Sequence, residues 1–243
     1  EVIIPVHTFT SSAYPFAKKG ANIVWSDIDL HTRVVTPKTI AERLTSKTKA
    51  IVVVHLYGYA ADMPEIIEIA RKHSLIVIED AAQALGSSID GKKAGTFGDI
   101  GVFSFHSHKN ITTLGEGGMI VVKNPDIASI IPMLRHNGHC AFPFEREHYW
   151  IPAMSNVDFP ELNGNALWPN NFCLGEIQCA LGTKLLDRID KINSEKRKRA
   201  LYFIDSLKKF DFLEFHRVDS ERHNYHLLVG MVKNEKRDDI IKF

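Results

Sequence analysis

The sequence predicts a three-layer α/β protein with a mostly parallel central sheet and helices on both faces. Short β-branched and apolar runs alternate with segments of helical periodicity through the first half of the chain. The run Ile51–Val54 is too short for a helix and apolar at every position, which is typical of a parallel strand buried on both faces. Strands that alternate with helices form parallel sheets whose functional groups lie at the carboxyl ends of the strands.

The expected elements follow one another in a regular order. Strands are predicted at Val2–Ile4, Asn22–Trp25, Ile51–Val54, Leu75–Ile78, Val102–Phe105 and Met119–Val122, and helices at Ala13–Lys19, from Pro37 onward and from Met63 to about His73. Thr36 before Pro37 fits an N-cap followed by a first-turn proline. In the Met63 helix, Ile66, Ile67 and Ala70 recur at helical spacing, which indicates one apolar face.

The second half of the chain has a different pattern. Residues 137–170 are rich in aromatics, Pro and Asn and are interpreted as a long irregular loop, a class that is usually functional or disordered. Helical periodicity returns from Gly175 to about Lys209, where the charged run Glu195–Arg199 is interpreted as a solvated face. Two strands are predicted at Phe212–Val218 and Tyr225–Val232. We therefore expect a large domain over residues 1–210, ending in a long inter-domain helix, and the start of a small α+β domain over 211–243.

The composition gives no sign of nucleic-acid binding or of a membrane span. Apolar residues make up 44% of the chain, and 30 Lys and Arg against 29 Asp and Glu give a net charge of +1, so no nucleic-acid footprint is indicated. No apolar run approaches the roughly 18–20 residues of a membrane span. The first residues, Glu1-Val-Ile-Ile-Pro, are typical of the interior of a fold and not of a signal peptide. Its three cysteines, Cys140, Cys173 and Cys179, have no CxxC spacing and are interpreted as thiols in a reducing cytoplasm.

The first candidate for chemistry is the acidic pair after the predicted strand Leu75–Ile78. Alternation along a strand directs one of Glu79 and Asp80 toward the functional edge of the sheet. A carboxylate beside a heterocyclic nitrogen keeps that nitrogen protonated, which pyridoxal phosphate (PLP) needs in order to withdraw electrons. The alternative interpretation of Asp80 is a cap on the next helix.

The second candidate is the segment from Ser104 to Gly118. A strand delivers Ser104, a loop presents Lys109 five residues later, and glycines allow tight turns near a ligand. A hydroxyl and a lysine at this spacing fit a ligand with both a phosphate and an aldehyde, because a lysine amine that has lost its proton attacks aldehydes. Taken alone, Lys109 also fits an ordinary surface lysine in a glycine loop.

Several ordered motifs resemble the DegT/StrS-type sugar aminotransferases, which are PLP enzymes of the aspartate-aminotransferase-like class. They are Glu79-Asp-Ala-Ala-Gln, Ser104-Phe-His-Ser-His-Lys-Asn and Gly115-Glu-Gly-Gly, with further matches at Pro5-Val-His-Thr-Phe-Thr-Ser, Val24-Trp-Ser-Asp-Ile-Asp, Val54-His-Leu-Tyr-Gly and Asn171-Phe-Cys-Leu-Gly-Glu. The resemblance covers nearly the whole chain, and the ordered set is far more specific than any single motif.

The resemblance implies a role for each matching residue. Lys109 would hold PLP covalently and move the proton between substrate and cofactor, Asp80 would pair with the pyridine nitrogen, and Gln83 would lie beside the ring. Ser104 would bind the phosphate, Phe9 would stack on the ring, and Asn171 would reach the phosphate from the partner subunit of a homodimer. His7 and His106 are candidates for the substrate side. The implied reaction is amino transfer, with glutamate as donor, to a keto-sugar nucleotide in amino-sugar or surface-polysaccharide biosynthesis.

The chain departs from the family pattern in three ways. Cys173 stands where the family usually carries an arginine, and Arg135 or Arg146 are candidate substitutes for that charge. The excursion 142–170 is longer than usual. The chain also starts after the family's N-terminal helices and phosphate-binding loop and stops inside the small domain, so we expect a fragment of a longer protein.

Three other functions are compatible with parts of this sequence. A PLP-dependent sugar dehydratase on the same fold would carry histidine in place of the lysine, and His108 next to Lys109 makes the register worth checking. A non-catalytic regulatory module on the same fold is possible in principle, because fold does not determine function. The pair His106 and His108 has the spacing of a zinc chelate, but no Cys or Asp partner has recognisable spacing, so no metal site is predicted.

Overall fold

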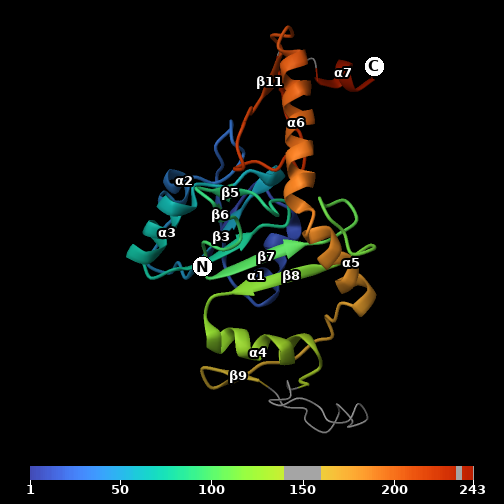
Figure 1. Cartoon of the computed structure of the whole chain (residues 1–243). Coiled ribbons are helices and arrows are strands. Elements are labelled where there is room, and N and C mark those ends of the chain that lie inside the picture. The colour runs from blue at the N-terminus through green and yellow to red at the C-terminus, as the bar shows by residue number, and fades with distance from the viewer. Residues whose placement is uncertain (140–159, 234–236, 243) are drawn as a thin grey trace. The chain divides into compact units, whose positions relative to one another are not determined.

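In a computed structural model of the chain, six strands form one central sheet in the order β2-β1-β3-β4-β7-β8 (Figure 1). These strands are β1 (Val2–Pro5), β2 (Ile23–Ser26), β3 (Ala50–Val54), β4 (Ile76–Asp80), β7 (Ile100–Ser104) and β8 (Gly118–Val122). The pairs β1–β2, β1–β3, β3–β4 and β4–β7 are parallel. The structure describes residues 1–139, 160–233 and 237–242. The predicted α/β class with a mostly parallel sheet is confirmed.

The helices and short ribbons complete the description. The helices are η1 (Thr10–Ser12), α1 (Tyr14–Lys18), α2 (Pro37–Ala41), η2 (Leu56–Gly58), α3 (Met63–Lys72), α4 (Pro125–Arg135), α5 (Glu176–Leu186), α6 (Ile189–Leu207) and α7 (Arg237–Lys242). The ribbons pair β5 (Ser88–Ile89) with β6 (Lys92–Lys93), β9 (Glu161–Leu162) with β10 (Asn165–Ala166) and β11 (Leu213–Phe215) with β12 (Gly230–Val232). The predicted cap of α2 is present, because the Thr36 side chain accepts a hydrogen bond from the Thr39 N–H.

The chain divides into two compact units, which are described separately. The first unit comprises residues 1–121 and 180–243 and contains the sheet, and the second comprises residues 122–179. The second unit contains α4 and the β9–β10 ribbon, and a β-bridge joins His136 to Asn171. The predicted boundary at residue 210 between a large and a small domain stays a prediction.

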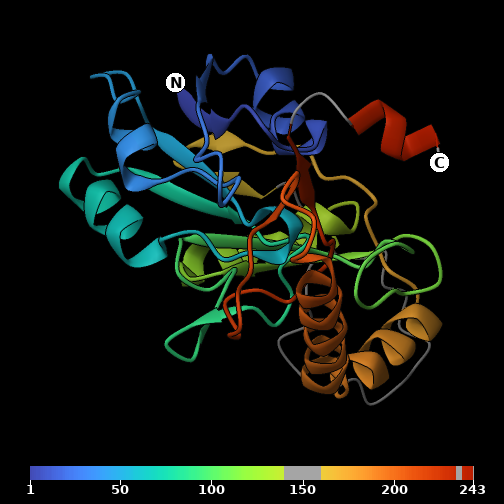
Figure 2. The same cartoon turned by 90° about the horizontal axis from the view of Figure 1, so that it is seen from above.

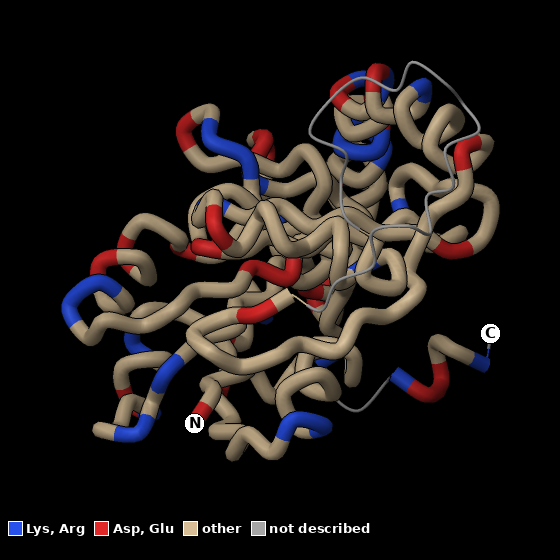
Figure 3. Tube along the Cα trace, turned by 90° about the horizontal axis from the view of Figure 1, so that it is seen from below, with Lys and Arg blue, Asp and Glu red and all other residues tan. Residues whose placement is uncertain are grey.

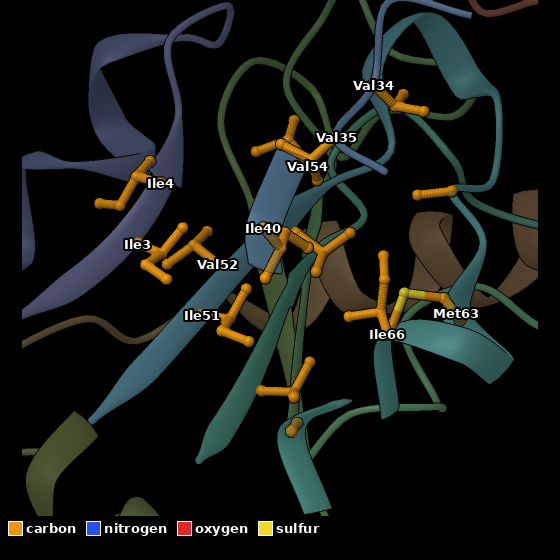
Figure 4. Close-up of a cluster of buried hydrophobic side chains, with 14 of the residues drawn as sticks. Ile3, Ile4, Val34, Val35, Ile40, Ile51, Val52, Val54, Met63 and Ile66 are labelled. Carbon is orange, nitrogen blue, oxygen red and sulfur yellow. The ribbon is translucent and has the colours of Figure 1, made fainter. Parts of the chain in front are cut away.

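The largest buried cluster lies in the first unit, where helices pack on the sheet (Figure 4). It brings together fully buried aliphatic side chains of β1, β3, α2 and α3: Ile3, Ile4, Ile51, Val52, Ile40, Met63 and Ile66. Full burial of one such side chain contributes about 1.5–3 kcal/mol. A second cluster joins Phe103 and Phe105 to Ile189 at the start of α6.

The continuous helix predicted from Gly175 to Lys209 is instead two helices, α5 and α6. The Asp187 N–H still bonds to the Thr183 carbonyl, whereas the Ile192 N–H begins a new series with the Arg188 carbonyl. No Gly or Pro marks the break in the sequence, so periodicity alone predicted one helix.

The strand predicted at Tyr225–Val232 is shorter than expected and covers only Gly230–Val232. The residues before it follow an irregular path beside the sheet (Figure 2). Their backbone groups bond outside the central sheet: the Ala60 N–H, in the loop after β3, donates to the Arg222 carbonyl (2.9 Å), and the Ser88 N–H of β5 donates to the Glu221 carbonyl (2.8 Å). This returning segment, residues 216–228, therefore belongs to the wall around the carboxyl edge of the sheet.

Acidic and basic residues are interspersed along the described chain (Figure 3). This agrees with the nearly balanced composition of 30 basic and 29 acidic residues. Within the described part of the chain, the helices are all too short or too polar to cross a membrane.

A fully buried hydrogen bond between His55, directly after β3, and Glu79 of β4 joins the two strands at the carboxyl edge of the sheet. Glu79 Oε2 lies 2.8 Å from His55 Nε2, and Glu79 also accepts the Gly95 N–H (2.7 Å) and the Gly98 N–H (2.6 Å). Because His55 Nδ1 accepts the Ala61 N–H, its Nε2 carries the proton donated to Glu79. Burial raises the pKa of Glu79, but the bonds from His55, Gly98 and Gly95 outweigh it and hold the pKa below its usual 4.5.

We predict that Glu79→Gln destabilises the fold by about 1–3 kcal/mol, because an amide NH₂ would face donors that now meet a carboxylate. A carboxylate with a lowered pKa contributes stability above about pH 4.5 that is lost as the pH falls through the folded value. The variant should therefore lose less stability on acidification than the wild type. Urea unfolding at several pH values measures both effects, with exposed Glu65→Gln as the control. Equal pH dependence of the two variants would contradict the assignment.

Candidate active site

A cavity of about 890 Å³ lies in the first unit, over one face of the sheet. Its floor is formed by every second residue of three adjacent strands: Val52 and Val54 of β3, Ile78 and Asp80 of β4, and Ile100, Val102 and Ser104 of β7. The register pairs Val54 with Asp80 and Asp80 with Val102, so these side chains share a face. The floor is apolar except at the carboxyl ends of β4 and β7, where Asp80 and Ser104 provide polar groups.

Asp80 points into this cavity while its neighbour Glu79 points into the core. The Asp80 carboxylate accepts the Ala82 N–H on Oδ1 (3.1 Å) and the Ser12 hydroxyl on Oδ2 (2.6 Å). The alternative interpretation required Asp80 to cap the next helix. No helix lies between β4 and β5, so Asp80 caps a turn instead. The carboxylate is thus held at the cavity wall with acceptor capacity left on both oxygens.

Lys109 lines the same cavity and is half-buried, which argues against an ordinary surface lysine. Burial lowers the pKa of the Lys109 ammonium below its usual 10.5, and the negative charge of Asp80 acts in the opposite direction. The two residues are therefore close enough to interact electrostatically. A lysine with a lowered pKa is neutral, and hence nucleophilic, over a wider pH range.

The loop that presents Lys109 is fixed by hydrogen bonds at its base and near its tip. At the base, the Phe105 N–H donates to the Gly117 carbonyl (2.7 Å), and a Cβ added at Gly117 would lie 2.1 Å from Thr113 Oγ1. Glycine at this position is required by close packing. Near the tip, Asn110 Nδ2 donates to Asn193 Oδ1 of α6 (2.9 Å).

A second partner of Asn110 comes from the returning segment 216–228. His226 Nδ1 lies 3.2 Å from Asn110 Oδ1 and must donate, because the amide oxygen has no hydrogen. Burial, with the nearby charges of Lys109 and Lys196, lowers the pKa of His226 to about 4. A neutral histidine thus supports the residue next to Lys109.

Ser104, Gln83 and Phe9 complete the cavity wall that the sequence predicted. Ser104 Oγ accepts the His106 N–H (3.3 Å), which leaves its own O–H available to a ligand. Gln83 Oε1 accepts the N–H of Tyr57 (2.5 Å), a residue held at φ 59°. Phe9 is 73% exposed, so its ring is available for stacking.

Of the two histidines predicted for the substrate side, only His106 lines the cavity. Its Nε2 lies 3.4 Å from Glu116 Oε1. His7 does not line the cavity, but its Nε2 lies 3.1 Å from the Tyr57 hydroxyl. His7 is thus connected to Gln83 only through Tyr57, and its role stays a prediction.

Asn171 and Cys173 belong to the second unit, as does Arg135. Asn171 is exposed and pairs with His136, and the Cys173 thiol donates to the Arg135 carbonyl (3.8 Å). Arg146, Cys140 and most of the excursion 142–170 lie outside the described residues. The cross-subunit role of Asn171 therefore stays a prediction.

Sequence reasoning missed four polar residues of the cavity: Thr8, Ser11, Ser12 and Glu116. Thr8 and Ser12 are far from Asp80 in sequence and belong to no hydrophobic pattern. Glu116 lies inside the motif Gly115-Glu-Gly-Gly, and this position next to the lysine loop could have indicated a place in the site. Across the described ranges, no three His, Cys, Asp or Glu side chains are arranged to hold a metal ion.

The fold and cavity define an α/β protein with a lysine and a carboxylate facing one ligand-sized space. The sequence model of the DegT/DnrJ/EryC1/StrS aminotransferase family matches residues 1–243, and the chain belongs to this family.

Individual relatives support the same family. GDP-perosamine synthase from Caulobacter vibrioides is 41% identical over 191 residues, covering 79% of the chain and 46% of the relative. The crystal structure of an aminotransferase from Psychrobacter cryohalolentis is 30% identical, with a TM-score of 0.81 over 99% of the chain and 63% of that protein. A GDP-4-keto-6-deoxymannose-3-dehydratase variant with bound GDP-perosamine is 26% identical, with a TM-score of 0.82 over 99% and 62%. The chain thus spans about half to two thirds of the length of these proteins.

We predict that the pKa of Lys109 lies below 10.5 because its ammonium is partly desolvated. Competitive acetylation at a series of pH values, read by mass spectrometry, should give Lys109 a lower midpoint than exposed Lys47. Asp80→Asn removes the charge that raises this pKa, so it should lower the midpoint further. A Lys109 midpoint equal to that of Lys47 would contradict the predicted lowering of its pKa.

Proposed function

We propose that the protein is a PLP-dependent aminotransferase that transfers an amino group from an amino acid, glutamate by preference, to a keto-sugar nucleotide. One observation carries this proposal: Lys109 and Asp80 line one cavity and interact electrostatically. We place the reaction in amino-sugar or surface-polysaccharide biosynthesis, in the cytoplasm, and in a homodimer.

The residues of the cavity fit PLP. The ligand needs an amine for its aldehyde, an anion for its ring nitrogen, a donor for its phosphate and a flat surface for its ring. The cavity of about 890 Å³ offers each of these groups. The amine is that of Lys109, the anion is Asp80, the phosphate donor is Ser104 and the flat surface is the ring of Phe9. The apolar floor of valines and isoleucines supplies the dry surroundings that strengthen such contacts.

Each residue has a distinct task in the reaction. When bound, PLP supplies an aldehyde that accepts amino groups and a protonated ring that withdraws electrons. Asp80 would keep the ring nitrogen protonated. Lys109 would hold the cofactor through its aldehyde, and its amine would move a proton at the substrate carbon. Gln83 would orient the ring from the side, and its oxygen is already fixed by the Tyr57 N–H.

The second candidate is a PLP-dependent sugar dehydratase, which the similarity in fold to the solved dehydratase favours. That chemistry places histidine at the position of the lysine. His108 also lines the cavity, but it is exposed, whereas Lys109 is half-buried and faces the charge of Asp80. This difference supports amino transfer.

We predict that borohydride reduction of the complete protein with PLP attaches the pyridoxyl group to Lys109, as identified by peptide mass spectrometry. Lys109→Arg should lose this attachment and lower amino transfer by about 10³-fold or more, because the charged guanidinium can neither bond to the aldehyde nor take up a proton. Lys123→Arg, on an exposed part of the chain, should keep both properties if expression is normal.

The substrate class is tested with the pyridoxamine phosphate form in a single turnover. We expect amino transfer to at least one keto-sugar linked to GDP, UDP or dTDP. Loss of the sugar C3 hydroxyl without amine incorporation would support the dehydratase. Failure with every sugar nucleotide, alongside turnover of a cyclic polyol ketone, would reject the proposed substrate.

The homodimer is tested by complementation. If Asn171 completes the partner's site, Asn171→Ala and Lys109→Ala homodimers are inactive at low PLP concentration. In a mixed dimer, one of the two sites combines the unchanged Lys109 of one subunit with the unchanged Asn171 of the other and is intact. Mixing equal amounts should then restore about a quarter of the wild-type activity, since half of the dimers are mixed. Activity that stays at the level of the separate variants would contradict a shared site.

A further inference from the structure

We infer that Ser12 is a positioning residue for Asp80 and that Thr8 extends the same hydrogen-bonded chain along the cavity wall. The inference rests on the proposed function, because it concerns how the carboxylate is aimed at the ring nitrogen of PLP. It assigns a task in the site to two residues that have no place in the roles described above.

The direction of each hydrogen bond follows from donor counting. Ser12 Oγ lies 2.6 Å from Asp80 Oδ2, and a carboxylate can only accept, so the single Ser12 hydrogen is donated to Asp80. Thr8 Oγ1 lies 2.7 Å from Ser12 Oγ. Because the Ser12 hydrogen is already used, Thr8 must donate to Ser12. The result is a directed chain from Thr8 through Ser12 to Asp80, in which each bond polarises the next.

The chain of hydroxyls restrains the carboxylate on the side that the backbone does not reach. The Ala82 N–H holds Oδ1 from the chain that follows β4, and Ser12 holds Oδ2 from the loop that follows β1. Two donors on opposite oxygens fix the plane of the carboxylate about its last rotatable bond. Without Ser12, Oδ2 would have no donor recorded in the described chain, and rotation would move the remaining lone pairs away from a ring nitrogen.

The local fold explains why Ser12 is well placed for this task. The turn η1 closes when the Ser12 N–H donates to the Phe9 carbonyl (3.0 Å), so the same short turn carries Phe9 and Ser12. Ser12 is only 7% exposed, whereas Phe9 is 73% exposed. One turn therefore places a buried hydroxyl against the carboxylate and an open aromatic ring in the wall of the same cavity.

The test uses the complete holoenzyme and ¹⁵N-labelled PLP. We expect Ser12→Ala to weaken PLP binding about tenfold, as loss of a hydrogen bond to a charged group predicts. The ¹⁵N signal of the ring should shift toward that of the unprotonated nitrogen. Ser12→Thr, which keeps the hydroxyl, should stay within about threefold of the wild type, and Thr8→Ala should lie between the two.

The matched control is Thr10→Ala, which removes an exposed hydroxyl from the same turn. If Ser12→Ala and Thr10→Ala give the same ¹⁵N signal and the same PLP affinity, the inference is wrong. If Ser12→Ala does not fold, Ser12→Cys keeps the size but offers a weak donor, and must shift the signal in the same direction. A wild-type protein that binds no PLP would instead reject the proposed function, so the two failures are distinguishable.

Discussion

The site depends on the opposite directions of two adjacent carboxylates at the end of β4. Because side chains alternate along a strand, Glu79 enters the core when Asp80 faces the cavity. Glu79 meets His55 and the N–H groups of Gly95 and Gly98, so its burial is fully compensated. A shift of the strand by one residue would turn Asp80 into the core and Glu79 toward the cavity. The buried hydrogen bonds of Glu79 thus determine which carboxylate faces the cavity.

Much of this arrangement follows from the sequence. Buried strands are visible as short β-branched runs such as Ile51–Val54, and parallel topology brings their carboxyl ends to one edge. Asp80, Ser104 and Lys109 could therefore be expected at a common edge before any coordinates, and the motif order identified the family. The general rules for α/β sheets were sufficient because these residues sit on, or directly after, strands.

The remaining features depend on contacts between distant segments, which no local pattern contains. Ser12 meets Asp80 and His55 meets Glu79 only after the sheet has formed, and neither contact has a periodicity that marks it. The break between α5 and α6 lacks a Gly or Pro signal. The irregular path of residues 216–228 is set by bonds to the loops after β3 and β4, which outweigh the strand propensity of residues such as Tyr225.

That returning segment has a consequence for how the protein is made. Asn224 bonds to the carbonyls of Gln83 and Leu85, and His226 bonds to Asn110, so loops from the first half of the chain are braced by residues synthesised more than a hundred positions later. While the ribosome is still extending the chain, the sheet can assemble but the lysine loop lacks its support. The contacts that brace these loops from the returning segment can therefore form only after residues 224 and 226 have been synthesised, well after the strands that carry the site.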